Sequence, residues 1–148
     1  VEMVISGYTG EEVREILTNA IESTFGRNTV QVDILRNMGA AAPAFGMIGT
    51  LVGLIIMLDN LGGDPTELGA GLAVALLTTL YGVMFARMIF MPAATKIQQR
   101  EEIVRFRNYL IAEGLSLLAD KKNPRYIADR MNSFLDPAIH FNIDKMKR

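Results

Sequence analysis

Cysteine is absent from the 148-residue sequence, and there is a single histidine. Without cysteine the chain has no disulfide framework, thiolate zinc site or cysteine nucleophile. The one histidine, His140, lies in a polar tail, which excludes His-based triads and multi-histidine metal sites. An excess of basic charge is missing too, with 15 Lys and Arg against 16 Asp and Glu, which argues against a nucleic-acid binder. These absences leave little room for hydrolytic or metal-dependent enzymes.

Charge is also absent from two internal stretches. Asn37 to Leu58 holds 22 residues and Leu68 to Ala86 holds 19 residues without a charged side chain, and only Arg87 interrupts the second run before Lys96. At about 1.5 Å per residue, a helix of either length crosses a hydrocarbon core of roughly 30 Å. Both runs are internal and too long for a signal peptide. We therefore predict transmembrane helices at 37–58 and 68–95, the second continuing inward, joined by a short loop at 59–67.

The basic residues are distributed unevenly around these helices. Residues 1–36 carry three and residues 96–148 carry eleven, whereas the loop at 59–67 carries three acidic residues and no basic one. By the positive-inside rule the loop faces outward, and the segments 1–36 and 96–148 are both cytoplasmic. The chain begins with Val1 rather than methionine, so we expect an upstream piece in the parent protein.

The flanking segments have helical signals, and no strand pattern is visible. Thr9 and Glu12 have the spacing of a capping box that starts a helix, and Gly26 predicts a break before the first span. Asn123-Pro124 predicts the start of a short helix that runs to Leu135. The predicted fold is all-α: a transmembrane helical hairpin whose long helices extend into a cytoplasmic helical domain.

Small residues recur at helical spacing in both spans. The predicted packing positions are Gly49 and Gly53 in the first span and Ala75 and Gly82 in the second, with Gly46 on the same face as the first pair. Small-xxx-small faces let helices approach closely in lipid, where packing drives association. Plain helix packing is one interpretation. The other adds the hydroxyls of Thr50, Thr78 and Thr79 as the polar lining of a wet pathway.

Each span also holds a proline. Pro43 lies inside the first span, and Pro92 lies just beyond Arg87 near the end of the second. Proline removes a backbone hydrogen bond and clashes with the preceding turn, so both positions are expected to bend or soften the helix. The sequence leaves open whether they are static kinks or hinges. Arg87 is interpreted as a residue that extends its side chain to the inner membrane interface.

Several motifs occur in order along the chain. They are Ala-Pro-Ala-Phe-Gly-Met-Ile-Gly-Thr-Leu-Val-Gly-Leu at 42–54, Ala-Val-Ala-Leu-Leu-Thr-Thr-Leu-Tyr-Gly at 73–82, Phe-Met-Pro-Ala-Ala at 90–94 and Lys-Asn-Pro-Arg at 122–125. In these motifs the sequence resembles the MotA/PomA family of flagellar-motor stator subunits, a branch of the group that includes ExbB and TolQ. The likeness extends from about Gly7 to Leu135. Family members have four transmembrane helices, so the resemblance implies that this chain holds the last two.

The resemblance implies an assembly in the bacterial inner membrane. Family members form a pentamer around a dimer of a MotB or PomB subunit, which carries the channel aspartate. Ion flow through that complex turns the ring against a rotor protein at the cytoplasmic face. The transported ion is H⁺ or Na⁺, and no other cofactor is implied.

The resemblance also implies roles for individual residues. Gly46, Thr50 and Thr79 match positions that line the ion path, and Thr78 is their neighbour. Pro43 and Pro92 match the two prolines that couple ion flow to movement. Arg87 departs from the small or amide residue expected at its position, and the rotor-contact residues of the family fall upstream of Val1.

Three functional classes remain open: an ion-driven stator, an ExbB/TolQ-type energiser coupled to an outer-membrane task, and a passive membrane scaffold. Lys122 to Arg125 and the Met-Ile-Gly-Thr motif at 47–50 favour the stator. The sequence contains no pair of nucleophile and base that would support an enzymatic function. Neither predicted span contains Asp or Glu, so the sequence supplies the walls of an ion path and leaves the carrier carboxylate to a partner.

Overall fold

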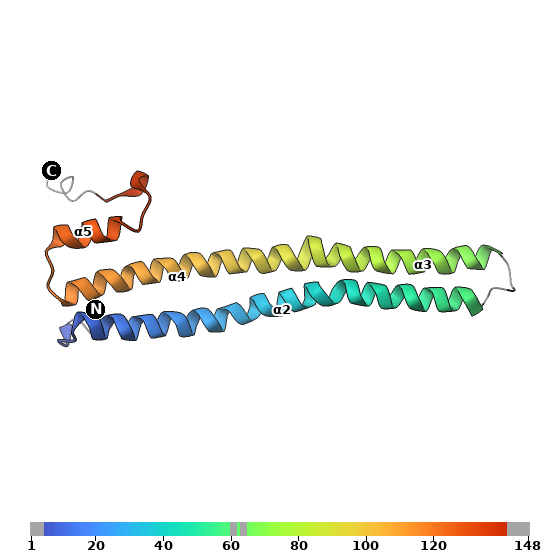
Figure 1. The fold of residues 1–148 in the computed structure, drawn as a ribbon, viewed down its shortest axis with the longest axis horizontal. Helices are drawn as coiled ribbons and strands as arrows, with labels where there is room; N and C mark the ends of the chain where they lie inside the picture. The colour runs from blue at the N-terminus through green and yellow to red at the C-terminus, as the bar shows by residue number, and fades with distance from the viewer. Residues whose placement is uncertain (1–4, 60–61, 63–64, 142–148) are drawn as a thin grey trace. The chain divides into compact units, whose positions relative to one another are not determined.

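The structure, a computed structural model, describes residues 5–59, 62 and 65–141. In this part of the chain it contains helices and turns and no strand. The elements are α2 (Gly10–Asp59), α3 (Pro65–Met84), the π-helix η1 (Phe85–Phe90), α4 (Met91–Ala119), α5 (Pro124–Asn132) and the 3₁₀ helix η2 (Pro137–Ile139). Figure 1 shows α2 running antiparallel to the segment formed by α3, η1 and α4. The predicted all-α class and the helical hairpin are confirmed.

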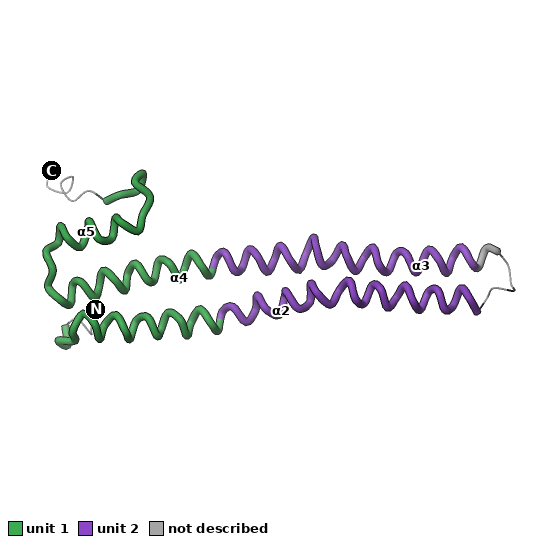
Figure 2. The backbone as a smooth tube through the Cα atoms, viewed as in Figure 1, with its two compact units in different colours: residues 1–27, 101–148 green, residues 28–100 purple. Residues whose placement is uncertain are grey.

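The chain divides into two compact units, which are coloured separately in Figure 2. Unit 1 comprises residues 1–27 and 101–148, and unit 2 comprises residues 28–100.

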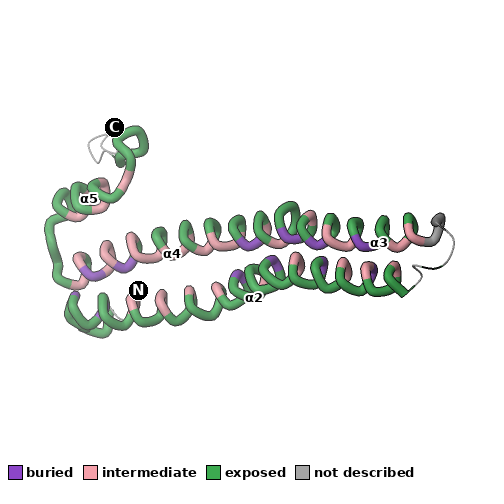
Figure 3. Tube along the Cα trace, turned by 45° about the vertical axis from the view of Figure 1, so that its right-hand side comes forward, coloured by how far each residue is buried: buried purple, intermediate pink, exposed green. Residues whose placement is uncertain are grey.

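Among the described residues, two helical segments are long and apolar enough to cross a membrane. They are Gly10–Asp59 and Leu68–Ala119, whose most apolar windows have mean hydropathies of 2.1 and 1.9. Only 11% and 6% of those windows are buried, and Figure 3 shows the long helices largely exposed. The core helix of a soluble protein buries its apolar side chains, whereas here Phe45, Ile55 and Leu76 are more than half exposed. Apolar surface of this extent calls for a cover of lipid or further helices.

The first long helix is continuous where the sequence predicts a break. α2 passes through Gly26 without interruption, so the predicted break there is wrong. A glycine inside a helix costs only about 1 kcal/mol relative to alanine, a penalty that packing of neighbouring residues offsets. α2 also continues through Pro43, whose missing N–H costs the helix one backbone hydrogen bond.

The second long helix contains a π-turn that the sequence analysis does not predict. In η1 the backbone N–H of Met91 donates to the carbonyl of Ala86, five residues back instead of the usual four. Pro92 follows directly and has no N–H to continue the series. The proline therefore coincides with a local change of helix type rather than with the end of the helix.

Capping contacts fix the start of α2 in unit 1. The Thr9 N–H donates to Glu12 Oε2 at 2.9 Å, and the Glu12 N–H donates to Thr9 Oγ1 at 3.3 Å. The predicted capping box is thus confirmed. The Gly10 N–H donates to Asp120 Oδ1 at 2.9 Å, which ties the first turn of α2 to the residue that follows α4.

The short helix α5 is tied back to α4. Asn123 Oδ1 accepts the Arg125 N–H at 2.9 Å, as the predicted N-cap requires. Arg130 Nε lies 3.2 Å from Glu113 Oε1, and Arg14 of α2 lies 3.6 Å from the other oxygen of the same carboxylate. The helix ends at Asn132 and not at the predicted Leu135, because the N–H groups of Phe134 and Leu135 bond three residues back, to the carbonyls of Met131 and Asn132, in tighter turns. The Asn132 side chain pairs with both backbone groups of Phe141, at 2.8 and 2.9 Å.

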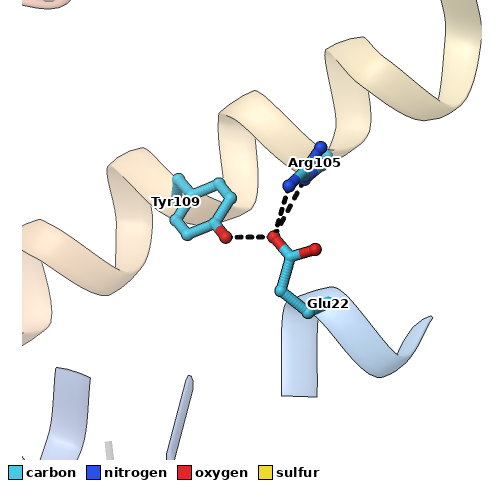
Figure 4. A network of polar contacts seen from close by, with 3 residues as sticks. All are labelled: Glu22, Arg105 and Tyr109. Atoms are coloured by element: carbon cyan, nitrogen blue, oxygen red, sulfur yellow. Dashed lines mark hydrogen bonds and ion pairs between the residues drawn. The ribbon is translucent and has the colours of Figure 1, made fainter. Parts of the chain in front are cut away.

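A polar network in unit 1 joins α2 to α4 (Figure 4). Glu22 Oε1 accepts from Arg105 Nε at 3.0 Å and from the hydroxyl of Tyr109. The Arg105 guanidinium also stacks over the Phe25 ring, 4.4 Å from its centroid. The hydrogen bond from Tyr109, followed by the one from Arg105, lowers the pKa of Glu22 below its ordinary value of 4.5.

The Glu22 network predicts a pH dependence of stability. Because the folded state lowers the pKa of Glu22, its stabilising contribution is complete above pH 4.5 and is lost as the pH falls through the lower folded value. We expect the thermal stability of the protein to fall with acidification over that range, and Glu22→Gln to flatten this fall. Thermal unfolding in detergent followed across the pH series measures it. An equally steep fall in the variant contradicts the assignment to Glu22.

Candidate functional site

A cluster of oxygen atoms lies between α2 and α3 in unit 2. The Thr50 hydroxyl lies 3.1 Å from the carbonyl oxygen of Gly46 and 3.0 Å from that of Ala75, and it is hydrogen bonded to the Thr79 hydroxyl. The Thr79 hydroxyl in turn donates to the Gly46 carbonyl at 3.2 Å. We call these two hydroxyls and two carbonyls the hydroxyl cluster.

The hydroxyl cluster has two hydroxyl protons to distribute among its four close oxygen contacts. Its two hydroxyl protons have carbonyl acceptors on both helices, and no buried side-chain nitrogen or oxygen in the described residues lacks a partner. Thr50 and Thr79 are half-buried, in a helix pair that is otherwise apolar. Hydroxyl and carbonyl oxygens are the groups that replace the water shell of a hard cation, and hydroxyls also relay protons. The arrangement can therefore serve either ion.

Glycines bring the two helix backbones together around the cluster. A Cβ at Gly82 would lie 2.7 Å from the carbonyl oxygen of Ala42 and 3.1 Å from the Cα of Gly46. A Cβ at Gly46 would lie 3.0 Å from both the Thr78 carbonyl oxygen and the Thr79 Cα. These obstacles are backbone atoms, so only glycine permits the approach that places Thr50 beside Thr79.

The remaining small residues extend the same contact along the hairpin. A Cβ at Gly53 would lie 2.8 Å from the Cβ of Ala75, which is fully buried, and a Cβ at Gly49 would lie 2.7 Å from Thr78 Oγ1. The small faces of the two spans thus meet each other within one chain. A bulky substitution at Gly53 acts first on this hairpin, before it acts on any contact between subunits.

In the described residues, the Thr78 hydroxyl meets the hydroxyl cluster through the Ala75 carbonyl, which also accepts from Thr50. The Thr78 hydroxyl donates to the Ala75 carbonyl of its own helix at 2.8 Å, and its side chain packs against Gly49. Of the residues proposed from the sequence for an ion path, the structure groups Gly46, Thr50 and Thr79. The Ala75 carbonyl joins them as an acceptor that the sequence analysis does not identify, although Ala75 lies four residues before Thr79, a spacing that places both on one helix face.

A pocket of about 480 Å³ opens beside the glycine contacts on the same hairpin. It is lined by Ala42, Phe45, Gly46, Thr78, Gly82, Phe85 and Phe90. Pro43, which follows the pocket residue Ala42 in the sequence, is half-buried. Pro92, which follows η1, is exposed. The structure therefore places the two prolines on different helices, both in unit 2.

Acidic groups do not reach the cluster from either span. The sequence has no Asp or Glu between Asp33 and Asp59, and no Asp or Glu between Glu67 and Glu101. In the described residues there is also no group of three or more His, Cys, Asp or Glu side chains that could hold a metal ion. The site offers neutral oxygens without a fixed negative charge.

Comparison with known proteins gives the family. Residues 1–108 match the model of the MotA/TolQ/ExbB proton channel family. The chain is 39% identical over 136 residues to "Chemotaxis protein PomA" of Vibrio alginolyticus, an alignment that covers 92% of this chain and 53% of that protein. It is 35% identical over 135 residues to "Motility protein A" of Borreliella burgdorferi, with 91% and 52% covered. The chain thus spans about half the length of these relatives.

Solved structures share the fold. The chain superposes on C. jejuni MotAB with a TM-score of 0.86 at 23% identity, covering 96% of this chain and 56% of that one. The TM-score is 0.83 at 24% identity for the flagellar MotAB stator complex from Bacillus subtilis, with 99% and 55% covered. The sequence match over residues 1–108, supported by the hairpin fold, shows that this chain belongs to the MotA/TolQ/ExbB proton channel family, a family of channels rather than of enzymes.

Proposed function

We propose that the chain is the part of an ion-driven flagellar-motor stator subunit that contains its last two transmembrane helices. The observation that carries this proposal is the hydroxyl cluster of Thr50 and Thr79, held between two apolar helices by close glycine contacts. The relatives named for motility, and the stator complexes with the same fold, point to the same function.

The chemistry of the site calls for a partner. A cation that crosses the low-dielectric core needs a group that accepts and releases it, most simply a carboxylate, and neither span supplies one. Gly46, Thr50 and Thr79, with Thr78 beside them, form the wall of the path in this proposal. A MotB/PomB-type subunit supplies the aspartate that carries H⁺ or Na⁺ along this wall.

The proposed topology follows the charge distribution. The spans at 37–58 and 68–95 cross the bacterial inner membrane, the loop at 59–67 is external, and the segments 1–36 and 96–148 are cytoplasmic. Five copies surround the partner, and Pro43 and Pro92 act as hinges that convert ion passage into movement against a rotor protein. The basic residues at both ends of the chain and the acidic loop between the spans support this orientation.

Complementation of a non-motile bacterium tests the proposal. The complete parent subunit, expressed in a strain without its own stator genes, is expected to restore swimming only together with its partner. Replacing the transmembrane aspartate of that partner by asparagine is expected to abolish swimming, because the carrier is lost. Restored uptake across the outer membrane without swimming favours the ExbB/TolQ-type alternative. Swimming without a partner contradicts the division of labour proposed here, and absence of both activities favours a passive scaffold.

A further inference from the structure

The π-turn η1 holds one residue more than an α-helix of the same rise. Its Met91 to Ala86 hydrogen bond spans five residues, and Pro92 then prevents the series from continuing. The segment lies inside unit 2, between the α3 face that carries Thr79 and the start of α4. Residues on both sides of the turn pack on α2: the Cβ position of Gly71 is 3.2 Å from Met57 Cβ, and that of Gly39 is 3.3 Å from Met91 Cγ.

The spacing of the buried small residues accounts for the additional residue. Ala75, Gly82 and Ala86 are buried and follow each other at seven and four positions, the spacing of one α-helical face. The next buried residue, Ala94, comes eight positions after Ala86 and is 1% exposed. In an uninterrupted α-helix this spacing would turn Ala94 about 80° away from the face of Ala86. The additional residue in the π-turn compensates for this rotation. It keeps Ala94 on the same side of the helix as Ala75, Gly82 and Ala86, a set of residues that we call the buried stripe.

The sequence also fits the register without the π-turn. Ala93 lies seven positions after Ala86, so a regular α-helix would bring Ala93 to the place that Ala94 occupies. Both registers therefore present an alanine to the same position. In the described chain the outer side of η1 is open, with Met88 71% and Ile89 51% exposed.

We propose that η1 is a rotary joint. Conversion of the π-turn into α-helix turns the residues beyond it by about 100° relative to α3, and exchanges Ala94 for Ala93 in the buried stripe. The movement that accompanies ion passage is thus a change of register at Phe85–Phe90. This inference rests on the proposed function, in which ion passage is converted into movement against a rotor protein.

Deletion of one residue tests the joint. Removing Met88 places Ala94 seven positions after Ala86. The helix can then be regular with the same residues buried. It no longer holds the additional residue that the change of register requires. In the complete subunit with its partner, we expect this deletion to assemble normally and to lose swimming. Met88→Ala is the matched control, because it removes the exposed side chain and keeps the residue number. It is expected to swim.

Disulfide cross-links report the register, since this sequence contains no cysteine. The pair Gly39→Cys and Met91→Cys spans the helices beyond the turn, and the pair Met57→Cys and Gly71→Cys spans them before it. Both links are expected to form, also in the Met88 deletion. In the subunit without the Met88 deletion, oxidation of the 39/91 pair is expected to stop swimming until a reductant is added. Oxidation of the 57/71 pair is expected to leave swimming intact.

Two results overturn the joint. One is a Met88 deletion that forms both cross-links and swims like Met88→Ala, which makes the π-turn a static feature. The other is a deletion that loses the link between positions 39 and 91, which contradicts the spacing argument. Failure of the unaltered subunit to restore swimming contradicts the proposed function and the joint together, so the two failures are distinguishable.

Discussion

Replacing Gly82 with leucine is expected to separate α2 from α3 and to unfold the hairpin around the hydroxyl cluster. The new side chain would begin 2.7 Å from the Ala42 carbonyl oxygen and 3.1 Å from the Gly46 Cα. Both obstacles are backbone atoms, which no change of side-chain rotamer removes. Overpacking typically costs about 1 to 3 kcal/mol, and we expect the upper end of this range here because backbone atoms must move. Detergent-induced unfolding of the purified subunit measures the loss.

Gly69→Leu provides the matched control for Gly82→Leu. Gly69 lies on the same helix, α3, and, apart from its chain neighbours and the nearby backbone of its own helix, no atom of the described residues comes within 4 Å of its Cβ position. We expect this variant to unfold at nearly the same detergent concentration as the unaltered protein. A loss of stability at Gly82 no larger than at Gly69 would show that the close backbone contact does not hold the hairpin.

The main architecture could be read from the sequence because it depends on local patterns. Uncharged runs of sufficient length specify apolar helices, the short connection between them specifies an antiparallel pair, and Thr9 with Glu12 specifies a helix start. Each of these signals lies within one element. The break predicted at Gly26 is wrong because the cost of one glycine is small, and the neighbouring Glu22 and Phe25 contact Arg105 of α4.

The site needed information that local patterns do not contain. Thr50 and Thr79 each lie on a small-residue face, but their contact depends on how two antiparallel helices slide against each other. Thr78 and Thr79 look equivalent in the sequence, yet adjacent residues on a helix point about 100° apart, so only Thr79 reaches Thr50. The π-turn is likewise visible only once the buried faces on both sides of it are known.

Thr50→Val is expected to be the most damaging change of a single polar group. Valine keeps the shape of threonine but removes the oxygen that contacts Gly46, Ala75 and Thr79. The Ala75 carbonyl then loses the Thr50 donor, and the proposed ion path loses one oxygen from its wall. Loss of one hydrogen-bonding group costs roughly 1 to 3 kcal/mol, and each 1.4 kcal/mol corresponds to about a tenfold change in affinity.

Swimming speed against external sodium, at constant proton-motive force, measures the effect in the complete subunit with its partner. If Thr50 supplies a sodium ligand, Thr50→Val raises the sodium concentration for half-maximal speed by about tenfold, and Thr50→Ser, which restores the oxygen, shifts it much less. Thr78→Val is the control on the neighbouring residue. The Thr78 hydroxyl donates within its own helix, so we expect this substitution to leave the sodium dependence nearly unchanged.

The sodium series also decides what the hydroxyls do. If the unaltered protein swims at the same speed whatever the sodium concentration, the transported ion is the proton. Water and the proposed carboxylate of the partner can pass a proton without the oxygen ligands that a dehydrated cation needs. Thr50→Val then lowers the speed only if Thr50 belongs to the proton relay. Unaltered swimming of both Thr50→Val and Thr79→Val under either ion gradient would reduce the cluster to a packing contact, because a wall oxygen that takes part in ion passage cannot be removed without slowing it.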